Sequence, residues 1–357
     1  MTTQTKQSLV YPWEDLLPEA GQVKEVADGV YWIRMPLPFA LDHINLWLLR
    51  DEIEGREGWT IIDTGVPRDE VKAHWEQLFA NALQGLPVLR VLVTHMHPDH
   101  VGLAGWICDK WQVPLAMTMT DYMVARHWTQ ADAKGDLSSG PTGQAAAAHF
   151  FKHGLTDPDA QAQIAARASY YPSMVSPLPA RFHRLLHGVP VRIGGREWQI
   201  IVGYGHAPEH ASLYCDELAV LISGDMVLPR ISTNVSVFDA EPEANPLPLF
   251  LNSLTAYDDL PDDTLVLPSH GRPFKGLHER IAQLQSHHRD RLDDTYIACK
   301  EGLTAAELVP VLFKRKLDMH QLSFAMGEAV AHLHALWYDG RLRREQNTDG
   351  VYRFYAI

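Results

Sequence analysis

The sequence predicts an α/β protein, because its pattern is that of strands and helices alternating around a shared core. Between about residues 30 and 277, short β-branched or apolar runs alternate with segments of helical periodicity. The 357 residues are 46% hydrophobic, which provides enough apolar material for a large core. At about 150 residues per domain, this length predicts two domains. We therefore expect a body over residues 1–277 and a second domain over residues 278–357.

Seven short segments of the body have the composition of buried strands. They are bounded by polar, glycine or proline residues, as strands in such folds are. Their ranges are 30–35, 44–49, 59–62, 88–93, 198–202, 218–222 and 264–267. Two segments between them, residues 66–83 and 101–110, have helical periodicity.

Residues 121–183 interrupt this alternation with a helical and irregular stretch that includes a Gly/Pro/Ser-rich loop at 134–143. An insertion of this length between core strands is typical of a cap or a pocket wall. Its aromatic side chains are expected in a core, and any of them that line a cleft would indicate a substrate with an apolar part. These aromatic residues are Trp128, Phe150, Phe151, Tyr170 and Tyr171.

After residue 277 the pattern becomes three helices, at 278–299, 304–314 and about 321–338, and two strands, at 341–344 and 351–355. That order predicts a small winged-helix-like domain. Its 11 basic and 11 acidic residues balance, and residues 321–340 contain no Lys or Arg, which a helix reading a DNA groove would need. We therefore expect a packing or dimerisation role rather than nucleic-acid binding. The apolar character of these helices favours a homodimer.

Composition narrows the functional classes. The formal net charge of −13 argues against a polyanion as the main partner. The first 30 residues lack a basic segment followed by an apolar one, and no apolar run approaches the roughly 20 residues that span a bilayer. These features predict a soluble, cytoplasmic protein without a membrane partner.

Cys108, Cys215 and Cys299 are too scattered for a thiolate metal cluster. Histidine is the outlier, with 19 residues against 10 lysines, and its special uses are metal ligation and proton transfer.

The densest group of ligand-type residues follows the strand predicted at 88–93. Three histidines and one aspartate lie within six positions, in Thr-His-Met-His-Pro-Asp-His. Alternate side chains of an extended chain point the same way, so His95 and His97 can bind one ion together. A helix beginning near Asp99 would direct Asp99 and His100 toward a second position, and Pro98 suits the turn before it. Such density at the end of an apolar strand predicts a two-metal site.

Two ions need further ligands, and later strand ends provide them. His206, Asp225 and His270 each follow a predicted strand, and Asp63 ends an earlier one. Nitrogen and oxygen donors of this kind favour two divalent ions, with zinc as our first choice and iron or manganese as alternatives.

The motifs HMHPDH, GHAPEH, GD and SHG, in this order and each after a strand, resemble those of the metallo-β-lactamase superfamily. The resemblance covers residues 30–274, and the tail resembles the winged-helix domain of one subgroup. It implies an αββα sandwich and a metal-dependent hydrolase. It further implies that His95, His97 and His206 hold the first ion, that Asp99, His100 and His270 hold the second, and that Asp225 bridges them. Asp63 would hydrogen-bond to the ligand loop without touching an ion.

The implied chemistry is attack by a hydroxide held between the ions, with Asp99 as the catalytic residue that orients it and takes up the proton. Two positions depart from common members of the family. Glu209 places a carboxylate beside a ligand histidine, where we expect solvation or an indirect role, and Leu228 occupies a position where related lactonases carry tyrosine. Nearby, Arg230 could bind a substrate anion or form a surface ion pair.

Three functions follow from these observations. The leading one is hydrolysis of an ester, thioester or lactone carbonyl in a small molecule with an apolar part. An alternative within the same fold is a phosphodiesterase or endoribonuclease, against which the acidic body counts. The alternative outside enzymology is a non-catalytic, metal-binding regulatory protein, which an intact ligand set disfavours.

Overall fold

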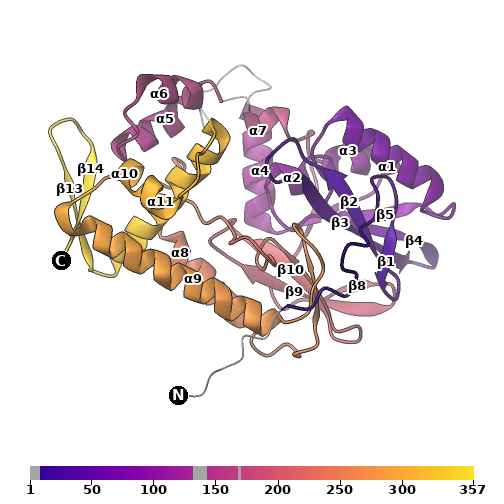
Figure 1. Cartoon of the computed structure of the whole chain (residues 1–357). Coiled ribbons are helices and arrows are strands. Elements are labelled where there is room, and N and C mark those ends of the chain that lie inside the picture. The colour runs from indigo at the N-terminus through magenta and orange to yellow at the C-terminus, as the bar shows by residue number, and fades with distance from the viewer. Residues whose placement is uncertain (1–8, 132–142, 168–169) are drawn as a thin grey trace, which may run out of the picture.

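The computed structural model describes residues 9–131, 143–167 and 170–357. Two β-sheets pack face to face, and helices cover the outer face of each (Figure 1). Helices α1 and α3 cover the first sheet, and α8, α9 and α11 lie on the side of the second. The expected αββα sandwich is therefore confirmed.

The first sheet has seven strands in chain order, antiparallel from β1 to β4 and parallel from β4 to β7. Its strands are β1 (Lys24–Ala27), β2 (Val30–Pro36), β3 (His43–Ile53), β4 (Arg56–Ile62), β5 (Val88–Leu92), β6 (Leu115–Met117) and β7 (His183–Arg184). The second sheet has the order β12-β11-β10-β9-β8, with only β11 and β12 parallel. Its strands are β8 (Val191–Ile193), β9 (Arg196–Gly203), β10 (His210–Cys215), β11 (Val220–Gly224) and β12 (Leu265–Pro268).

The helices of the body and of the insertion are α1 (Asp69–Asn81), α2 (Pro98–Val101), α3 (Ala104–Trp111), α4 (Met119–Ala131), α5 (Gly143–Lys152), α6 (Pro158–Ala165), α7 (Tyr170–Ser173) and α8 (Pro246–Ser253). The tail contains α9 (Leu277–Ala298), α10 (Ala305–Leu312), α11 (Met319–Tyr338) and a hairpin of β13 (Leu342–Gln346) and β14 (Tyr352–Ala356). The three tail helices and two terminal strands thus occur in the predicted order, while the winged-helix designation stays a prediction.

Successive side chains along a strand point to opposite faces of the sheet, so each strand provides apolar side chains to two layers. On β2, Trp32 faces the core between the sheets, whereas Ile33 faces the core beneath α1 and α3. On β9, Trp198 and Ile200 face the inter-sheet core, and Ile201 faces the core shared with the tail helices. Because both faces of these strands are buried, their sequences are nearly continuous runs of apolar residues.

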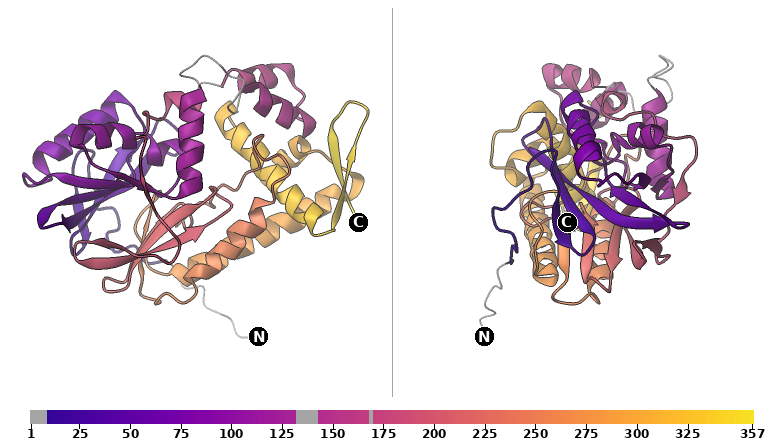
Figure 2. Two further views of the ribbon diagram at one scale, coloured as in Figure 1. Left: turned by 180° about the vertical axis from the view of Figure 1, so that it is seen from behind. Right: turned by 90° about the vertical axis from the view of Figure 1, so that its right-hand side faces the viewer.

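The insertion divides between two parts of the molecule. Tyr122 and Ala125 of α4 pack in the core of the first sheet. Phe150 of α5 and Ile164 of α6 pack in the core that contains α10 and α11, and seen from behind α5 and α6 lie beside those helices (Figure 2). Most of the predicted Gly/Pro/Ser-rich loop at 134–143 lies outside the described residues.

The tail helices share one core with the second sheet. Apolar residues of α11 such as Met326, Val330 and Leu333 are buried against α8, α9 and the sheet. The apolar character that suggested a homodimer is therefore used within the chain, and the dimer stays a prediction without that support. The domain boundary at residue 277 likewise stays a proposal.

Five strands were not predicted: β1, β6, β7, β8 and β10. Four of them have only two to four residues, too few to show a period. The fifth, β10, begins at His210, the last residue of the GHAPEH motif, where no strand was predicted. Among the described residues, no helix combines the length and apolar character that crossing a lipid bilayer requires.

Candidate metal centre

The predicted ligands gather where strands of both sheets end. His95, His97, Asp99 and His100 follow β5, and Asp63 follows the neighbouring strand β4. His206, Asp225 and His270 follow β9, β11 and β12 of the other sheet. Pro98 opens α2, where its missing N–H leaves no intrahelical hydrogen bond unmade. His97 precedes it with an extended backbone. The side chains of His95 and His97 therefore point in one direction, and those of Asp99 and His100, in the helix, point in another.

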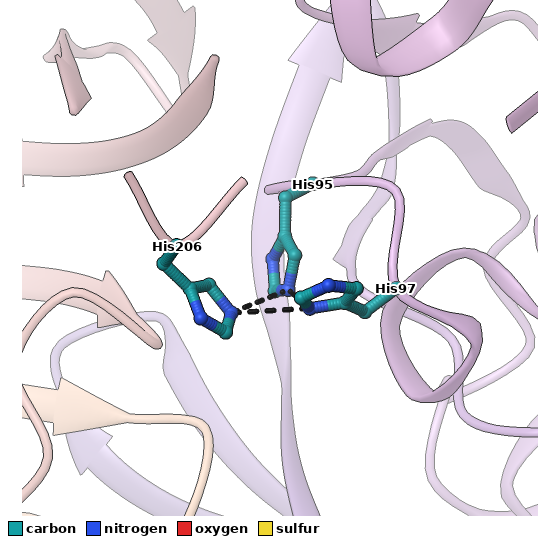
Figure 3. Close-up of side chains that lie close together, drawn as sticks. All are labelled: His95, His97 and His206. Atoms are coloured by element: carbon teal, nitrogen blue, oxygen red, sulfur yellow. Dashed lines mark hydrogen bonds between the residues drawn. The ribbon is translucent and has the colours of Figure 1, made fainter. Parts of the chain in front are cut away.

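Three imidazole nitrogens converge on one point (Figure 3). His95 Nε2 lies 2.9 Å from His97 Nδ1, which lies 3.1 Å from His206 Nε2, and the third side of the triangle is 3.2 Å. A tetrahedral zinc ion with Zn–N bonds of about 2.0–2.1 Å separates its nitrogens by roughly 3.3 Å. His206 Nδ1 donates to the carbonyl oxygen of Asn234 at 2.8 Å, which leaves the lone pair on Nε2. The triangle therefore fits a small cation.

A second group lies beside the first. His270 Nε2 is 3.4 Å and His100 Nε2 is 3.7 Å from the same oxygen, Oδ2 of Asp99. The other ring nitrogens are held, because His270 Nδ1 donates to the carbonyl of His43 and His100 Nδ1 donates to Asp63. Each Nε2 is thus directed toward Asp99, as expected of metal ligands whose far nitrogen is anchored.

Asp225 lies between the two groups. Its Oδ2 is 3.3 Å from His206 Nε2, and its Oδ1 is 3.6 Å from both His100 Nε2 and His270 Nε2. His100 Nε2 and Asp225 Oδ1 are buried without a hydrogen-bond partner. Unpaired buried polar atoms are costly, so two of them facing one space fit a cation. The structure therefore brings all seven predicted ligands into two adjoining groups.

Asp63 holds the ligand loop from behind. Its Oδ1 accepts the Thr94 N–H, and its Oδ2 accepts the Thr94 hydroxyl and His100 Nδ1–H, all at 2.8 Å. Asp63 has φ of 61°, a left-handed conformation that Asp and Asn tolerate better than most residues. Its geometry matches the supporting role expected of it.

Electrostatics keep the carboxylates charged. Burial would raise the pKa of Asp99, but His100 and His270 outweigh it and lower this pKa to about 2. Burial lowers the pKa of His97 to about 3, and His206 acts in the same direction. Burial would also lower the pKa of His270, yet Asp225 and Asp99 raise it to about 10. Ionised carboxylates and neutral imidazoles are the forms that bind metal, so His270 would release a proton on ion binding.

Two supporting residues were missed. Asp121, at the start of α4, accepts Met96 N–H at 2.8 Å and Glu209 N–H at 2.6 Å, joining the two main ligand loops. Burial raises its pKa to about 6. His210 Nε2 accepts the Asp225 N–H at 3.0 Å and fixes the backbone at Asp225. His210 was visible within the GHAPEH motif, whereas an isolated aspartate early in a helix gives no such signal.

A pocket of about 1040 Å³ opens onto the centre and has a mainly apolar wall. Apolar side chains come from the β2–β3 loop, from the segment after β11 and from the tail. They are Leu37, Phe39, Leu41, Leu228, Ile231, Phe313, Leu317, Met319 and Phe324. Of the five aromatic residues singled out in the insertion, Tyr170 lines this pocket. Tyr171 instead donates to the carbonyl oxygen of Met96 in the ligand loop.

Glu209 and Arg230 lie outside the pocket lining. The Glu209 carboxylate accepts the Thr120 N–H at 3.0 Å, next to the beginning of α4. It therefore supports the loop rather than facing the pocket. The Arg230 side chain is exposed, so neither residue reaches the centre in this structure.

Known proteins share this architecture. A family model for the metallo-β-lactamase superfamily matches residues 41–270, and one for the metallo-β-lactamase-like C-terminal domain matches residues 292–357. The crystal structure of a β-lactamase domain protein from Burkholderia ambifaria has 54% sequence identity and a TM-score of 0.90, covering 98% of each chain. A metallo-β-lactamase family protein from Thermus thermophilus has 27% identity and a TM-score of 0.76, covering 93% of this chain and all of its own. The probable metallo-hydrolase YqjP of Bacillus subtilis (strain 168) is 25% identical over 321 residues, 87% of this chain and 92% of its own length.

Proposed function

This chain belongs to the metallo-β-lactamase superfamily and is a hydrolase, and we propose that it uses two divalent ions to cleave an ester, thioester or lactone with an apolar acyl group. The observation that carries the proposal is the triangle of nitrogens from His95, His97 and His206 beside the unpaired Asp225 Oδ1. A cation can bind the lone pairs of all three nitrogens at once, whereas a proton between them is shared by only two.

In this proposal the three histidines of the triangle hold one ion. Asp99, His100 and His270 hold the other, and Asp225 contributes one oxygen to each group. The donor set suits zinc, with iron and manganese as alternatives. Bound there, the ions would supply a hydroxide nucleophile near neutral pH and would polarise the carbonyl oxygen.

The protein's own residues orient the attacking water and transfer protons. The Asp99 side chain is more open to the pocket than that of Asp225, with exposed fractions of 18% and 9%. Its carboxylate is charged and can accept a proton from the attacking water and return it to the leaving group. Asp63 and Asp121 fix the two sides of the ligand loop, which keeps Asp99 at a constant position.

The apolar wall supports the choice of substrate. Leu37, Phe39, Leu228 and Phe324 would cover an alkyl chain, and burial of each methylene favours binding by about 0.8 kcal/mol. A nucleic acid would need clustered positive charge, whereas α11, which contributes to this wall, contains no Lys or Arg.

The test is hydrolysis by metal-analysed protein of a p-nitrophenyl ester, an acyl-CoA thioester, an acyl-homoserine lactone, bis-p-nitrophenyl phosphate and single-stranded RNA. We expect chelator-sensitive turnover of carbonyl compounds, with two ions per chain and rates that increase with acyl length. The His97→Ala variant should lose activity. The His183→Ala variant, which alters an exposed histidine at the end of the insertion, should keep it.

Two results would overturn the proposal. Turnover confined to the phosphodiester or to RNA would show that the bond cleaved is a different one. Metal binding with no turnover of any carbonyl compound at any acyl length would favour the non-catalytic alternative.

A further inference from the structure

Arg167 lines the same pocket as the proposed metal ligands His97 and Asp99. Building on the proposed function, we propose that Arg167 binds an anionic group, a carboxylate or a phosphate, carried by the substrate away from the scissile carbonyl. The substrate would then be an ester, thioester or lactone with an apolar chain and a negatively charged group, one end at the metal centre and the other at this guanidinium.

Arg167 lies where three separate segments of the chain meet. Its Nη1 donates to Ser323 Oγ at 3.0 Å and its Nη2 donates to His320 Nδ1 at 2.8 Å, both in the first turns of α11. Its guanidinium carbon lies 4.6 Å from the ring centroid of Tyr170. The His320 ring in turn stacks on Phe39 of the β2–β3 loop at 4.8 Å, with an interplanar angle of 14°. The guanidinium is thereby held in one orientation.

These partners leave the positive charge uncompensated. Ser323 and Tyr170 are neutral, and the pKa of His320 is lowered by burial and further by Arg167 itself, so that ring is neutral as well. Among the described residues, no carboxylate forms an ion pair with Arg167. An arginine has five N–H donors, so further donors remain for a ligand after these two hydrogen bonds. A half-buried cation without a counter-ion is costly, and an anionic ligand would remove that cost.

The carboxylates that share this pocket are already engaged. Asp318 accepts the Gln321 N–H at 2.8 Å as the cap of α11. Glu328 accepts from Asn234 Nδ2 at 3.0 Å. Asp99 and Asp225 belong to the metal centre. Arg315, exposed at the pocket wall, adds a second positive charge, and no described carboxylate pairs with it.

The two ends of the proposed site belong to one pocket. Arg167 and Tyr170 line it together with His97, Asp99 and His270. One small molecule in this pocket can therefore contact both the guanidinium and the metal centre. The apolar side chains between them, such as Phe39 and Phe324, suit an alkyl linker.

The experiment compares two p-nitrophenyl esters of equal length, one with a methyl end and one with a terminal carboxylate, over a series of lengths. An acyl-CoA thioester, whose charge is on phosphates, forms a third arm. The variants are Arg167→Met, which removes the charge, and Arg167→Lys, which keeps it but loses the planar donors. The matched control is Arg126→Met, because Arg126 also lies over a tyrosine ring with neutral acceptors but outside the pocket.

We expect Arg167→Met to lower kcat/KM for one or both anionic substrates by about 10–100-fold, mainly through KM, as for loss of a charge-assisted hydrogen bond. The neutral ester should change less than about twofold, Arg167→Lys should fall between, and Arg126→Met should leave the ratio unaltered. An equal loss for charged and neutral substrates, or no loss for either anionic arm, would overturn the inference.

A binding measurement separates this inference from the proposed function. The ester with a terminal carboxylate is the half-ester of a dicarboxylic acid, and the monoamide of that acid serves as a ligand that is not turned over. Calorimetric titration of chelator-treated protein with this monoamide should show weaker binding to Arg167→Met than to the wild type. If no ester is hydrolysed, the proposed function fails while this binding difference still supports Arg167. If esters are hydrolysed but binding of the monoamide is unchanged, the anion site is refuted and the function stands.

Discussion

Replacing Asp63 with asparagine should weaken metal binding without disturbing the backbone. Asparagine tolerates the φ of 61° found at this position, so the substitution introduces little strain. Its amide oxygen can still accept the Thr94 N–H. Its amide nitrogen, however, would face His100 Nδ1–H, which Asp63 Oδ2 accepts at 2.8 Å. His100 then has to move its proton to Nε2, the nitrogen that faces Asp99 and Asp225.

The magnitude follows from these contacts. A protonated Nε2 cannot bind an ion, so in the proposed two-ion centre the ion at His100 would lose one ligand or require the tautomer to reverse. Altering a residue that orients a ligand histidine typically lowers metal affinity by about 10–100-fold, which corresponds to about 1.4–2.7 kcal/mol. Losing the charge-assisted bond from His100 should also lower the free energy of unfolding of the metal-free protein by about 1.5–3 kcal/mol.

The assay is competition with a chromophoric chelator, combined with urea unfolding of the metal-free protein. Asp51→Asn is the matched control, because Asp51 is equally buried and accepts from Thr60 Oγ1, Arg90 and the Gly194 N–H, away from the ligands. It should lose stability and keep metal affinity. If Asp63→Asn binds both ions as tightly as the wild type, or if Asp51→Asn weakens binding to the same degree, Asp63 does not orient His100 as described.

Three further outcomes are expected. The His97→Ala variant should lower metal content and reduce kcat by at least about 100-fold while its circular dichroism stays unchanged, and full activity would exclude His97 as a ligand. Burial lowers the pKa of His149 to about 4, so below its ordinary 6.5 the unfolded chain takes up a proton that the folded chain does not. The free energy of unfolding should therefore fall by up to about 1.4 kcal/mol per pH unit between pH 6.5 and 4, and urea titrations of His149→Gln should show a shallower fall. The Gly224→Ala variant, whose Cβ would contact the His210 ring while φ is +53°, should lose about 1–3 kcal/mol of stability and some metal affinity. Gly55→Ala, with a similar φ of +77° and nothing within 4 Å, should keep metal affinity, and equal affinity in both variants would contradict the steric argument.

Much of the candidate metal centre could be predicted because the residues proposed as ligands belong to local sequence patterns. His95 and His97 alternate on an extended segment, and Pro98 begins the helix that redirects Asp99 and His100. Those relations depend only on neighbouring backbone geometry, which short sequence patterns encode. The later ligands could be found because each follows an apolar run that ends a strand.

The supporting residues could not be found in that way. Asp121 reaches Met96 across 25 positions, and His210 reaches the Asp225 N–H across 15. The strand β10 between the predicted ones was hidden because its first residue, His210, belongs to a ligand motif. Which polar side chains meet across such separations depends on the order of strands in the sheets.

The sequence by itself determined that the chain alternates strands and helices and that histidines and aspartates follow the strands, because periodicity and ligand chemistry are properties of neighbouring residues. Only the tertiary structure decided what surrounds those ligands. The insertion divided between two cores, α11 folded against the second sheet, and Arg167 met His320 across 153 positions of the chain. Contacts of that kind arise from the packing of whole layers, which buries apolar faces from distant segments together and thereby brings along the polar groups beside them.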